Sequence, residues 1–183
     1  MNTLISLYRR LSYGLDAMTP AVLPTLARLV FVAVLAGYYW ASASTKLGPG
    51  MLGFLMPSDG AYLQIFPRTV EALGYEFSKL TAFHRAVVTA GTWAEFLLPL
   101  LITLGLMTRL SALGMIGFIT LQSVVDIFGH GVGAETIGAW FDRSPDGPIL
   151  DQRSFWVLTL LILVLRGAGP LSLDAILRRR FAG

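Results

Sequence analysis

The 183-residue sequence contains no cysteine, only two histidines and few charged residues. The absence of cysteine excludes a disulfide framework, a thiolate metal site and a thiol–disulfide relay. Any redox chemistry must therefore use a bound cofactor. Charged residues make up 14% of the chain and hydrophobic residues 55%, whereas an average soluble domain is about a quarter charged. This composition is typical of a membrane protein.

Four apolar stretches are long enough to cross a membrane, because a spanning helix needs about 20 residues to cross a hydrocarbon core of about 30 Å. We place the crossings at about 25–44, 86–107, 110–129 and 154–168. The sequence thus predicts an all-α fold, an integral membrane four-helix bundle with short interfacial helices.

No linker divides the chain, so we predict a single transmembrane domain over residues 1–183. The segments 45–85 and 130–153 are then outer loops, and residues 169–183 form a cytoplasmic tail. Within the first outer loop, apolar residues recur at helical spacing between Arg68 and Leu80, which indicates a short amphipathic helix. In the tail, Ser172 is a candidate N-cap for a surface helix.

About twenty amphiphilic residues precede the first crossing, and we expect Pro20 and Pro24 to close them. The small residues 41–43 superficially resemble a signal-peptide cleavage site. However, the apolar run is longer than a signal-peptide core, and the aromatic residues 38–40 resemble an interfacial belt. A retained membrane helix is the favoured interpretation.

Basic residues gather on one side of this topology. They lie near the N-terminus, in the hairpin between the second and third crossings, and in the tail: Arg9, Arg10, Arg109, Arg178, Arg179 and Arg180. The positive-inside rule therefore predicts that both termini are cytoplasmic and that both long loops face outward.

Glu95 is the most informative residue, because it lies near the centre of the apolar segment from Val87 to Met107. A charged side chain at mid-membrane costs about 2.5–3.5 kcal/mol, so Glu95 should face protein or water. Gln122 is expected at about the same depth from the outer face as Glu95, and Tyr39 and Asp126 somewhat nearer to that face. We expect these polar groups to converge in one cavity that opens to the outside.

The two histidines, His84 and His130, are expected at the mouth of this cavity, near Glu135. Imidazole and carboxylate groups suit a divalent or copper ion. Because two histidines far apart in the sequence are a weak signal, a solvated loop mouth is favoured and no metal site is predicted. No basic patch interleaved with aromatics indicates nucleic-acid binding.

Several residues occur as spaced motifs. Along the first helix these are Arg28, Gly37 and Lys46, and in the second crossing the intramembrane Glu95 is followed by Pro99. The hairpin contains Gly105, Thr108 and Arg109, and residues 167–174 form a Gly-x-Gly-Pro-Leu-Ser-Leu-Asp tail. In these motifs, across all four crossings, the chain resembles the DoxX family of small four-helix bacterial membrane proteins.

The resemblance implies a multi-pass protein of the bacterial cytoplasmic (inner) membrane, acting as the membrane subunit of a redox or quinone-linked system. It makes the chain a candidate accessory subunit of a quinone-linked oxidoreductase, with quinone as the cofactor and a partner subunit at the outer loops. Glu95 would be the proton carrier, and Tyr39, Gln122 and Asp126 would line the quinone pocket.

The alternative is a non-catalytic membrane anchor or assembly partner for a soluble or membrane protein. In that case Glu95 is a packing element that pairs with Arg28, Lys46 or Gln122. The sequence favours neither interpretation of Glu95, whereas Arg28 and Arg109 are more typical of topology anchors than of ligand-binding residues.

Overall fold

The computed structural model describes residues 2–50 and 52–181, and all regular structure within these ranges is helical. Four continuous helical segments are long and apolar enough to cross a membrane: Thr3–Thr45, Ala82–Leu104, Thr108–His130 and Pro148–Arg166. The prediction of an all-α fold with four spanning helices is confirmed. These four segments indicate a multi-pass membrane protein.

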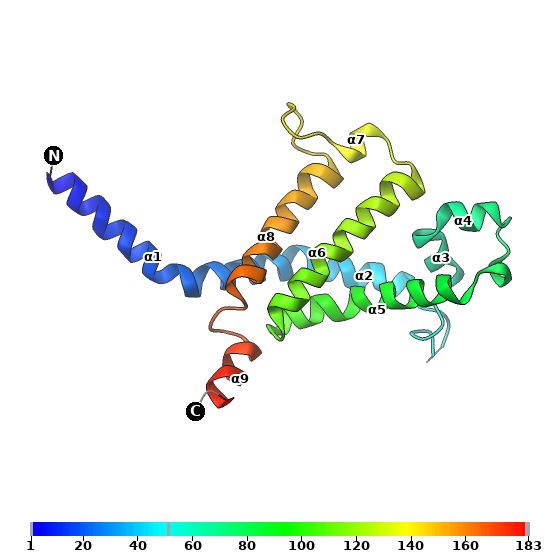
Figure 1. Ribbon diagram of the computed structural model, residues 1–183, viewed down its shortest axis with the longest axis horizontal. Coiled ribbons are helices and arrows are strands. Elements are labelled where there is room, and N and C mark those ends of the chain that lie inside the picture. The colour runs from blue at the N-terminus through cyan, green and yellow to red at the C-terminus, as the bar shows by residue number, and fades with distance from the viewer. Residues whose placement is uncertain (1, 51, 182–183) are drawn as a thin grey trace.

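The first segment consists of α1 (Asn2–Phe31), a π-helical turn η1 (Val32–Ala36) and α2 (Gly37–Thr45). The others are α5 (Ala82–Leu104), α6 (Thr108–Val124) with the π-helical turn η3 (Val125–His130), and the π-helical turn η4 (Pro148–Gln152) with α8 (Arg153–Arg166). Figure 1 shows α2 alongside α5, and α6 alongside α8. The two pairs cross one another to form the bundle.

The start of the first helix differs from the prediction. Pro20 and Pro24 do not close a separate amphiphilic segment, because α1 runs through both of them from Asn2. A proline removes only one backbone donor, and Pro24 is fully buried, so its packing against the bundle offsets the lost hydrogen bond. Figure 1 shows the first half of α1 extending away from the other helices.

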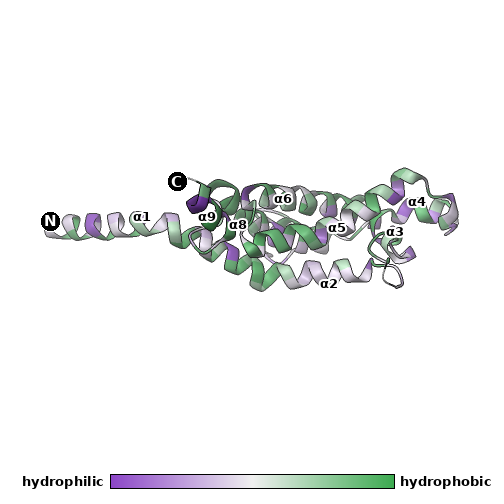
Figure 2. Cartoon of the chain, turned by 90° about the horizontal axis from the view of Figure 1, so that it is seen from below, coloured by the Kyte–Doolittle hydropathy of each residue, from purple (hydrophilic) through white to green (hydrophobic). Residues whose placement is uncertain are grey.

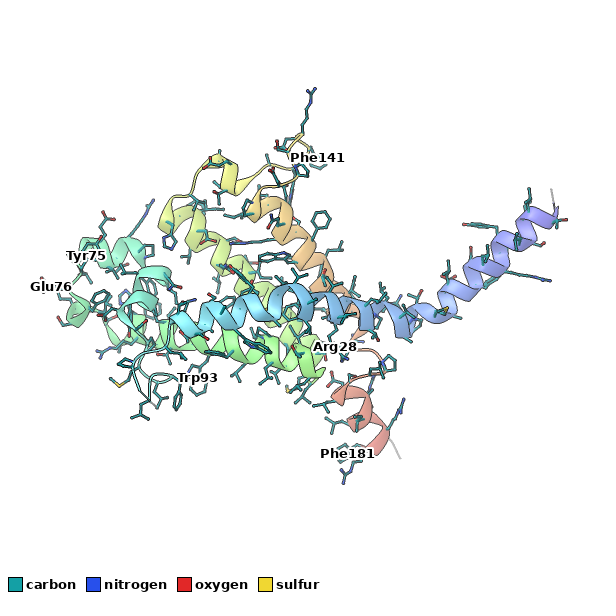
Figure 3. The ribbon with its side chains drawn as sticks, turned by 180° about the vertical axis from the view of Figure 1, so that it is seen from behind. Arg28, Tyr75, Glu76, Trp93, Phe141 and Phe181 are labelled. Carbon is teal, nitrogen blue, oxygen red and sulfur yellow. The ribbon has the colours of Figure 1, made fainter. Side chains whose placement is uncertain are left out.

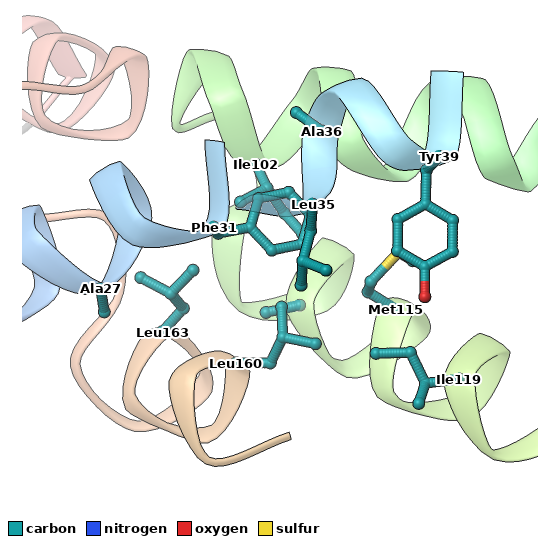
Figure 4. Close-up of a cluster of buried hydrophobic side chains, with 11 residues drawn as sticks. Ala27, Phe31, Leu35, Ala36, Tyr39, Ile102, Met115, Ile119, Leu160 and Leu163 are labelled. Atoms are coloured by element: carbon teal, nitrogen blue, oxygen red, sulfur yellow. The ribbon is translucent and has the colours of Figure 1, made fainter. Parts of the chain in front are cut away.

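The core lies where the four segments cross. Phe31 and Leu35 of the first segment meet Ile102 of α5 and Leu160 and Leu163 of α8, as Figure 4 shows. All five side chains are at most 2% exposed. By contrast, many leucines on the outer helix faces are exposed, as expected for side chains that contact lipid.

The first outer segment is folded rather than a simple loop. It contains α3 (Asp59–Ile65), α4 (Pro67–Ala72) and a 3-10 turn η2 (Phe77–Lys79). The predicted single helix from Arg68 to Leu80 is wrong, because Gly74 and Tyr75 adopt positive φ angles of 61° and 62° that end it. Its apolar residues still contribute to a second buried cluster beside α5.

The remaining helices are short. The helix α7 (Ala134–Ile137) lies in the second outer segment, and the fourth crossing begins at Pro148, six residues before the predicted start at 154. The tail forms α9 (Leu173–Phe181), whose predicted cap is confirmed: the Ala175 N–H donates to Ser172 Oγ at 3.1 Å. Figure 2 shows apolar colouring over the bundle and strongly hydrophilic colouring in α9.

Candidate functional site

Glu95 forms a buried ion pair with Lys46. The Lys46 Nζ lies 2.9 Å from Oε2 and 3.0 Å from Oε1 of Glu95, and it also donates to Ser42 Oγ at 2.8 Å. The two side chains are only 5% and 7% exposed. Of the three expected partners Arg28, Lys46 and Gln122, the structure selects Lys46, which satisfies the carboxylate within the protein.

Tyr39 and Gln122 are brought together as expected. The Tyr39 hydroxyl donates to Gln122 Oε1 at 3.2 Å, and Gln122 Nε2 donates to the Tyr38 hydroxyl at 3.1 Å. Tyr39 is 1% exposed, and its ring packs edge-on against Phe118. Figure 4 shows Tyr39 beside Met115 at the edge of the apolar core. The amide of Gln122 therefore links the first segment to α6.

Asp126 belongs to a second ion pair, which lies between the third and fourth crossings. Arg153 Nη2 lies 2.6 Å from Asp126 Oδ2, and Arg153 Nη1 donates to Ser123 Oγ at 2.8 Å. The side chain of Arg153 is 10% exposed and that of Asp126 is 27% exposed. This pair holds the start of α8 against η3, at the end of the third crossing.

A groove of about 610 Å³ lies between α6 and α8. Its walls are mainly apolar, with contributions from Ile119, Ile127, Val157, Leu158 and Leu161. Ser123, Trp140 and Arg153 also line it. One of these lining residues, Arg153, has a buried Nε with no hydrogen-bond partner in the described part of the chain, so a donor beside the groove is left unsatisfied.

The predicted candidates are therefore divided between separate sites. This groove is not lined by Glu95, Tyr39, Gln122 or Asp126. Asp126 forms an ion pair with the lining residue Arg153, and Glu95 forms an ion pair with Lys46. The expectation of one cavity shared by all these polar groups is replaced by two ion pairs and a tyrosine–amide chain.

The two histidines have separate hydrogen-bond partners. His84 Nδ1 lies 2.8 Å from Thr81 Oγ1 and caps the start of α5, and His130 Nε2 lies 3.0 Å from the Gln64 carbonyl oxygen. Within residues 2–50 and 52–181, no three histidine or acidic side chains are grouped so that they could hold a metal ion.

Several motif residues meet at the opposite end of the bundle. Arg28 Nη2 donates to the Leu171 carbonyl oxygen in the tail, and Figure 3 shows Arg28 at the junction of α1 with the tail. Gly105 ends α5 with a φ of +66°, and a Cβ at this position would overlap Arg28 and Ser172. Gly105 is therefore required by both its backbone conformation and its close packing.

Asp174 fastens the tail to the hairpin. Its carboxylate accepts hydrogen bonds from the Met107 and Thr108 N–H groups at 2.8 and 2.9 Å, and thereby caps α6. Its own N–H donates to the Gly105 carbonyl oxygen. Burial alone would raise the pKa of Asp174, but these hydrogen bonds outweigh that effect and hold the pKa below its usual value.

The other motif residues have simpler surroundings. Pro99 is buried in α5, and its carbonyl oxygen accepts a hydrogen bond from Thr103 Oγ1. Arg109 Nη1 donates to the Val164 carbonyl oxygen at 3.1 Å. A Cβ added at Gly37 would meet nothing within 4 Å, so packing within the chain does not explain that glycine.

Sequence reasoning missed the roles of Ser42, Arg153 and Asp174. Arg153 was assigned to the end of an outer loop, yet its position next to an apolar segment and opposite Asp126 of the preceding crossing was a usable signal. Asp174 lies at the start of its own helix, and nothing in the local sequence indicates that it caps another helix.

Comparison with protein-family models, curated proteins and solved structures finds no match to this chain in any of the three. The similarity to the DoxX family stays a prediction from the motifs.

Proposed function

We propose that this chain is a DoxX-like membrane subunit of a quinone-linked redox system, and that the groove between α6 and α8 receives the quinone ring. One observation carries the proposal: a mainly apolar groove between two spanning helices is lined by Arg153, whose buried Nε has no hydrogen-bond partner in the described chain. Ligand sites are typically apolar clefts with a few placed polar groups.

The charge of the groove favours a neutral ligand. Asp126 already neutralises Arg153 at 2.6 Å, so an anionic ligand would add an uncompensated charge in a low-dielectric region. A quinone is neutral, soluble in lipid, and carries carbonyl oxygens that accept hydrogen bonds. When bound, it would supply the electron-accepting chemistry, while Arg153 would hold one carbonyl oxygen and Asp126 would fix the orientation of the guanidinium.

Electrons and a further substrate would have to come from a partner subunit. The two outer segments offer a surface for such a partner, because each exposes an aromatic side chain: Tyr75 in the first is 59% exposed and Trp140 in the second is 61% exposed. Figure 3 shows Tyr75 and Phe141 at the periphery of the bundle. This assignment makes the chain an accessory subunit rather than a self-contained enzyme.

Charge asymmetry supports the proposed orientation in a bacterial inner membrane. The end of the bundle with both termini and the α5–α6 hairpin holds eight of the 14 basic residues but two of the 11 acidic ones. The basic residues are Arg9, Arg10, Arg28, Arg109, Arg166, Arg178, Arg179 and Arg180, and the acidic ones are Asp16 and Asp174. The positive-inside rule places this end in the cytoplasm.

The second candidate function is a non-catalytic anchor or assembly factor. The ion pair of Glu95 and Lys46 favours it, because both charges are buried and mutually satisfied, and such a pair resembles a packing element more than a proton carrier. Under this alternative, the outer segments bind a partner and the groove between α6 and α8 is filled by lipid chains.

The test is quinone binding by the purified full-length chain in lipid nanodiscs, measured with a short-chain quinone through quenching of tryptophan fluorescence. Arg153→Met should weaken binding about tenfold or more, because the buried donor is lost. Thr120→Phe should also weaken binding, since Thr120 lines the groove without joining the ion pair. The matched control is Arg143→Met in the exposed outer loop.

Loss of affinity in both groove variants, with the control unchanged, would support the proposal. Quinone affinity that is equal in all four proteins would refute it and favour the anchor function. That alternative has its own test, in which replacement of residues 130–147 should reduce recovery of a partner from native membranes.

A further inference from the structure

A second pocket lies at the opposite end of the bundle from the outer loops. It has a volume of about 330 Å³ and is bounded by the α5–α6 hairpin, the end of α8 and the surface helix α9. Met107, Arg109, Leu110, Leu177 and Arg178 are among the residues that line it. Because α5 and α8 end here and α6 begins here, the pocket lies at the level of the membrane surface.

Two guanidinium groups at this pocket retain unused donors. Arg109 Nη1 donates to the Val164 carbonyl oxygen, and Arg178 Nε donates to the Asp174 carbonyl oxygen at 3.3 Å. In the ranges that the structure describes, neither arginine forms an ion pair with a carboxylate. A guanidinium has five N–H donors in a planar fork, which suits bidentate contact with a phosphate group.

The carboxylate of Asp174 also lines this pocket, but its lone pairs are directed elsewhere. Oδ1 and Oδ2 accept the Met107 and Thr108 N–H groups at the start of α6. The positive end of the helix dipole partly offsets its charge. The two arginines therefore dominate the charge that an incoming ligand meets.

The apolar side of the pocket identifies the ligand more closely. Leu110 and Leu177 are 64% and 41% exposed, and Leu113, one turn further along α6, is 56% exposed. An apolar strip thus leads from the arginines along α6 toward the membrane interior. A free phosphate ion would make no use of this strip, whereas a phosphate that carries acyl chains would contact both parts.

We infer that this pocket binds the phosphate of an anionic glycerophospholipid between Arg109 and Arg178, with the acyl chains along Leu110 and Leu113 of α6. Basic pockets beside spanning helices are suited to such headgroups. The lipid would join the hairpin to α9 and hold the surface helix against the membrane. This pocket shares no lining residue with the groove between α6 and α8, so lipid binding here does not depend on quinone binding there.

The test compares full-length protein in detergent micelles that contain either phosphatidylglycerol or phosphatidylcholine, with retained lipid counted by native mass spectrometry. We expect phosphatidylglycerol to be retained preferentially. Arg109→Gln/Arg178→Gln should reduce its retention about tenfold, because two charged contacts are lost. Arg9→Gln/Arg10→Gln removes the same charge from the first half of α1 and should change retention less than about twofold.

Arg178→Gln alone serves if the double variant does not fold, because Arg178 is exposed on α9 outside the spanning helices. It should reduce retention about threefold or more. Equal retention of the two lipids, or equal losses in the pocket and α1 variants, would overturn the inference in favour of diffuse surface charge. Full competition by soluble glycerol phosphate would also overturn it, because the apolar strip would then contribute nothing.

Discussion

Glu95→Gln is expected to destabilise the bundle, although the substitution is nearly isosteric. It removes the negative charge that faces Lys46 Nζ at 2.9 Å and leaves a buried ammonium group in its place. At an effective dielectric constant of about 20, the attraction across this distance is about 6 kcal/mol before desolvation is subtracted. Removal of one partner from a buried pair typically costs about 3–5 kcal/mol.

Two remaining hydrogen bonds of Lys46 reduce this loss of stability. Lys46 Nζ keeps its hydrogen bonds to Ser42 Oγ at 2.8 Å and to the Ser42 carbonyl oxygen at 3.3 Å. We therefore expect Glu95→Gln to lower the free energy of unfolding by about 3 kcal/mol, the lower end of the range. Lys46→Met/Glu95→Leu, which leaves no buried charge, should lie within about 1–2 kcal/mol of the wild type.

The measurement is reversible unfolding in mixed micelles, analysed as a double-mutant cycle over the two positions. Glu76→Gln is the matched control, because Glu76 and Lys79 also pair at 2.9 Å but are 58% and 54% exposed. An exposed pair contributes about 1 kcal/mol or less. If Glu95→Gln proved no more destabilising than Glu76→Gln, the structural role assigned to the buried pair would be refuted.

Three further substitutions test the remaining contacts. Gly105→Ala should cost about 2–5 kcal/mol in unfolding free energy, because it combines a strained φ with overlap on Arg28; Gly14→Ala, in open space on α1, should be neutral or slightly stabilising. Asp174→Asn should remove about 1–2 kcal/mol above pH 4. The native pKa of Asp174 is lowered, so the stabilisation by its carboxylate is present above the unfolded pKa of about 4 and is lost as the pH falls through the native pKa. The difference in unfolding free energy between Asp174→Asn and wild type should therefore shrink in acid. Tyr39→Phe should cost about 1 kcal/mol, since the half-buried Gln122 amide oxygen loses its hydrogen-bond donor, and the unfolding assay measures this cost directly.

The spanning helices could be predicted from sequence because length and hydrophobicity are local properties. The third crossing, for example, was expected at 110–129 and is found at Thr108–His130. The start of α1 could not be predicted in the same way. Whether Pro24 ends a helix depends on what packs around its ring, and that information lies in distant parts of the chain.

The amphipathic segment from Arg68 to Leu80 shows a different limit. Two residues of its apolar pattern, Val70 and Leu80, are buried. However, the pattern did not reveal that Gly74 and Tyr75 reverse the chain between them. Spacing records which side chains are buried, and two short elements around a turn can bury the same side chains as one helix.

The candidate site was the least predictable part, because each polar side chain had several possible partners. Glu95 could have paired with any of three residues, and the choice of Lys46 depends on how α2 lies along α5. The position of Arg153 beside an apolar segment is visible in the sequence, but its pairing with Asp126 depends on how the third and fourth crossings pack together. Pairings across 27 and 49 residues depend on the packed bundle rather than on local sequence.

These pairings also separate stability from ligand binding. Protonation of Glu95 would leave Lys46 charged and buried without its counter-ion, so proton uptake at this site opposes the packing that places it there. The pair of Asp126 and Arg153 differs, because Arg153 lines the groove and retains a donor with no partner among the described residues. If the protein handles a lipid-soluble carrier, Arg153 is therefore the better candidate for contact with it, and Glu95 maintains the bundle in which that contact can occur.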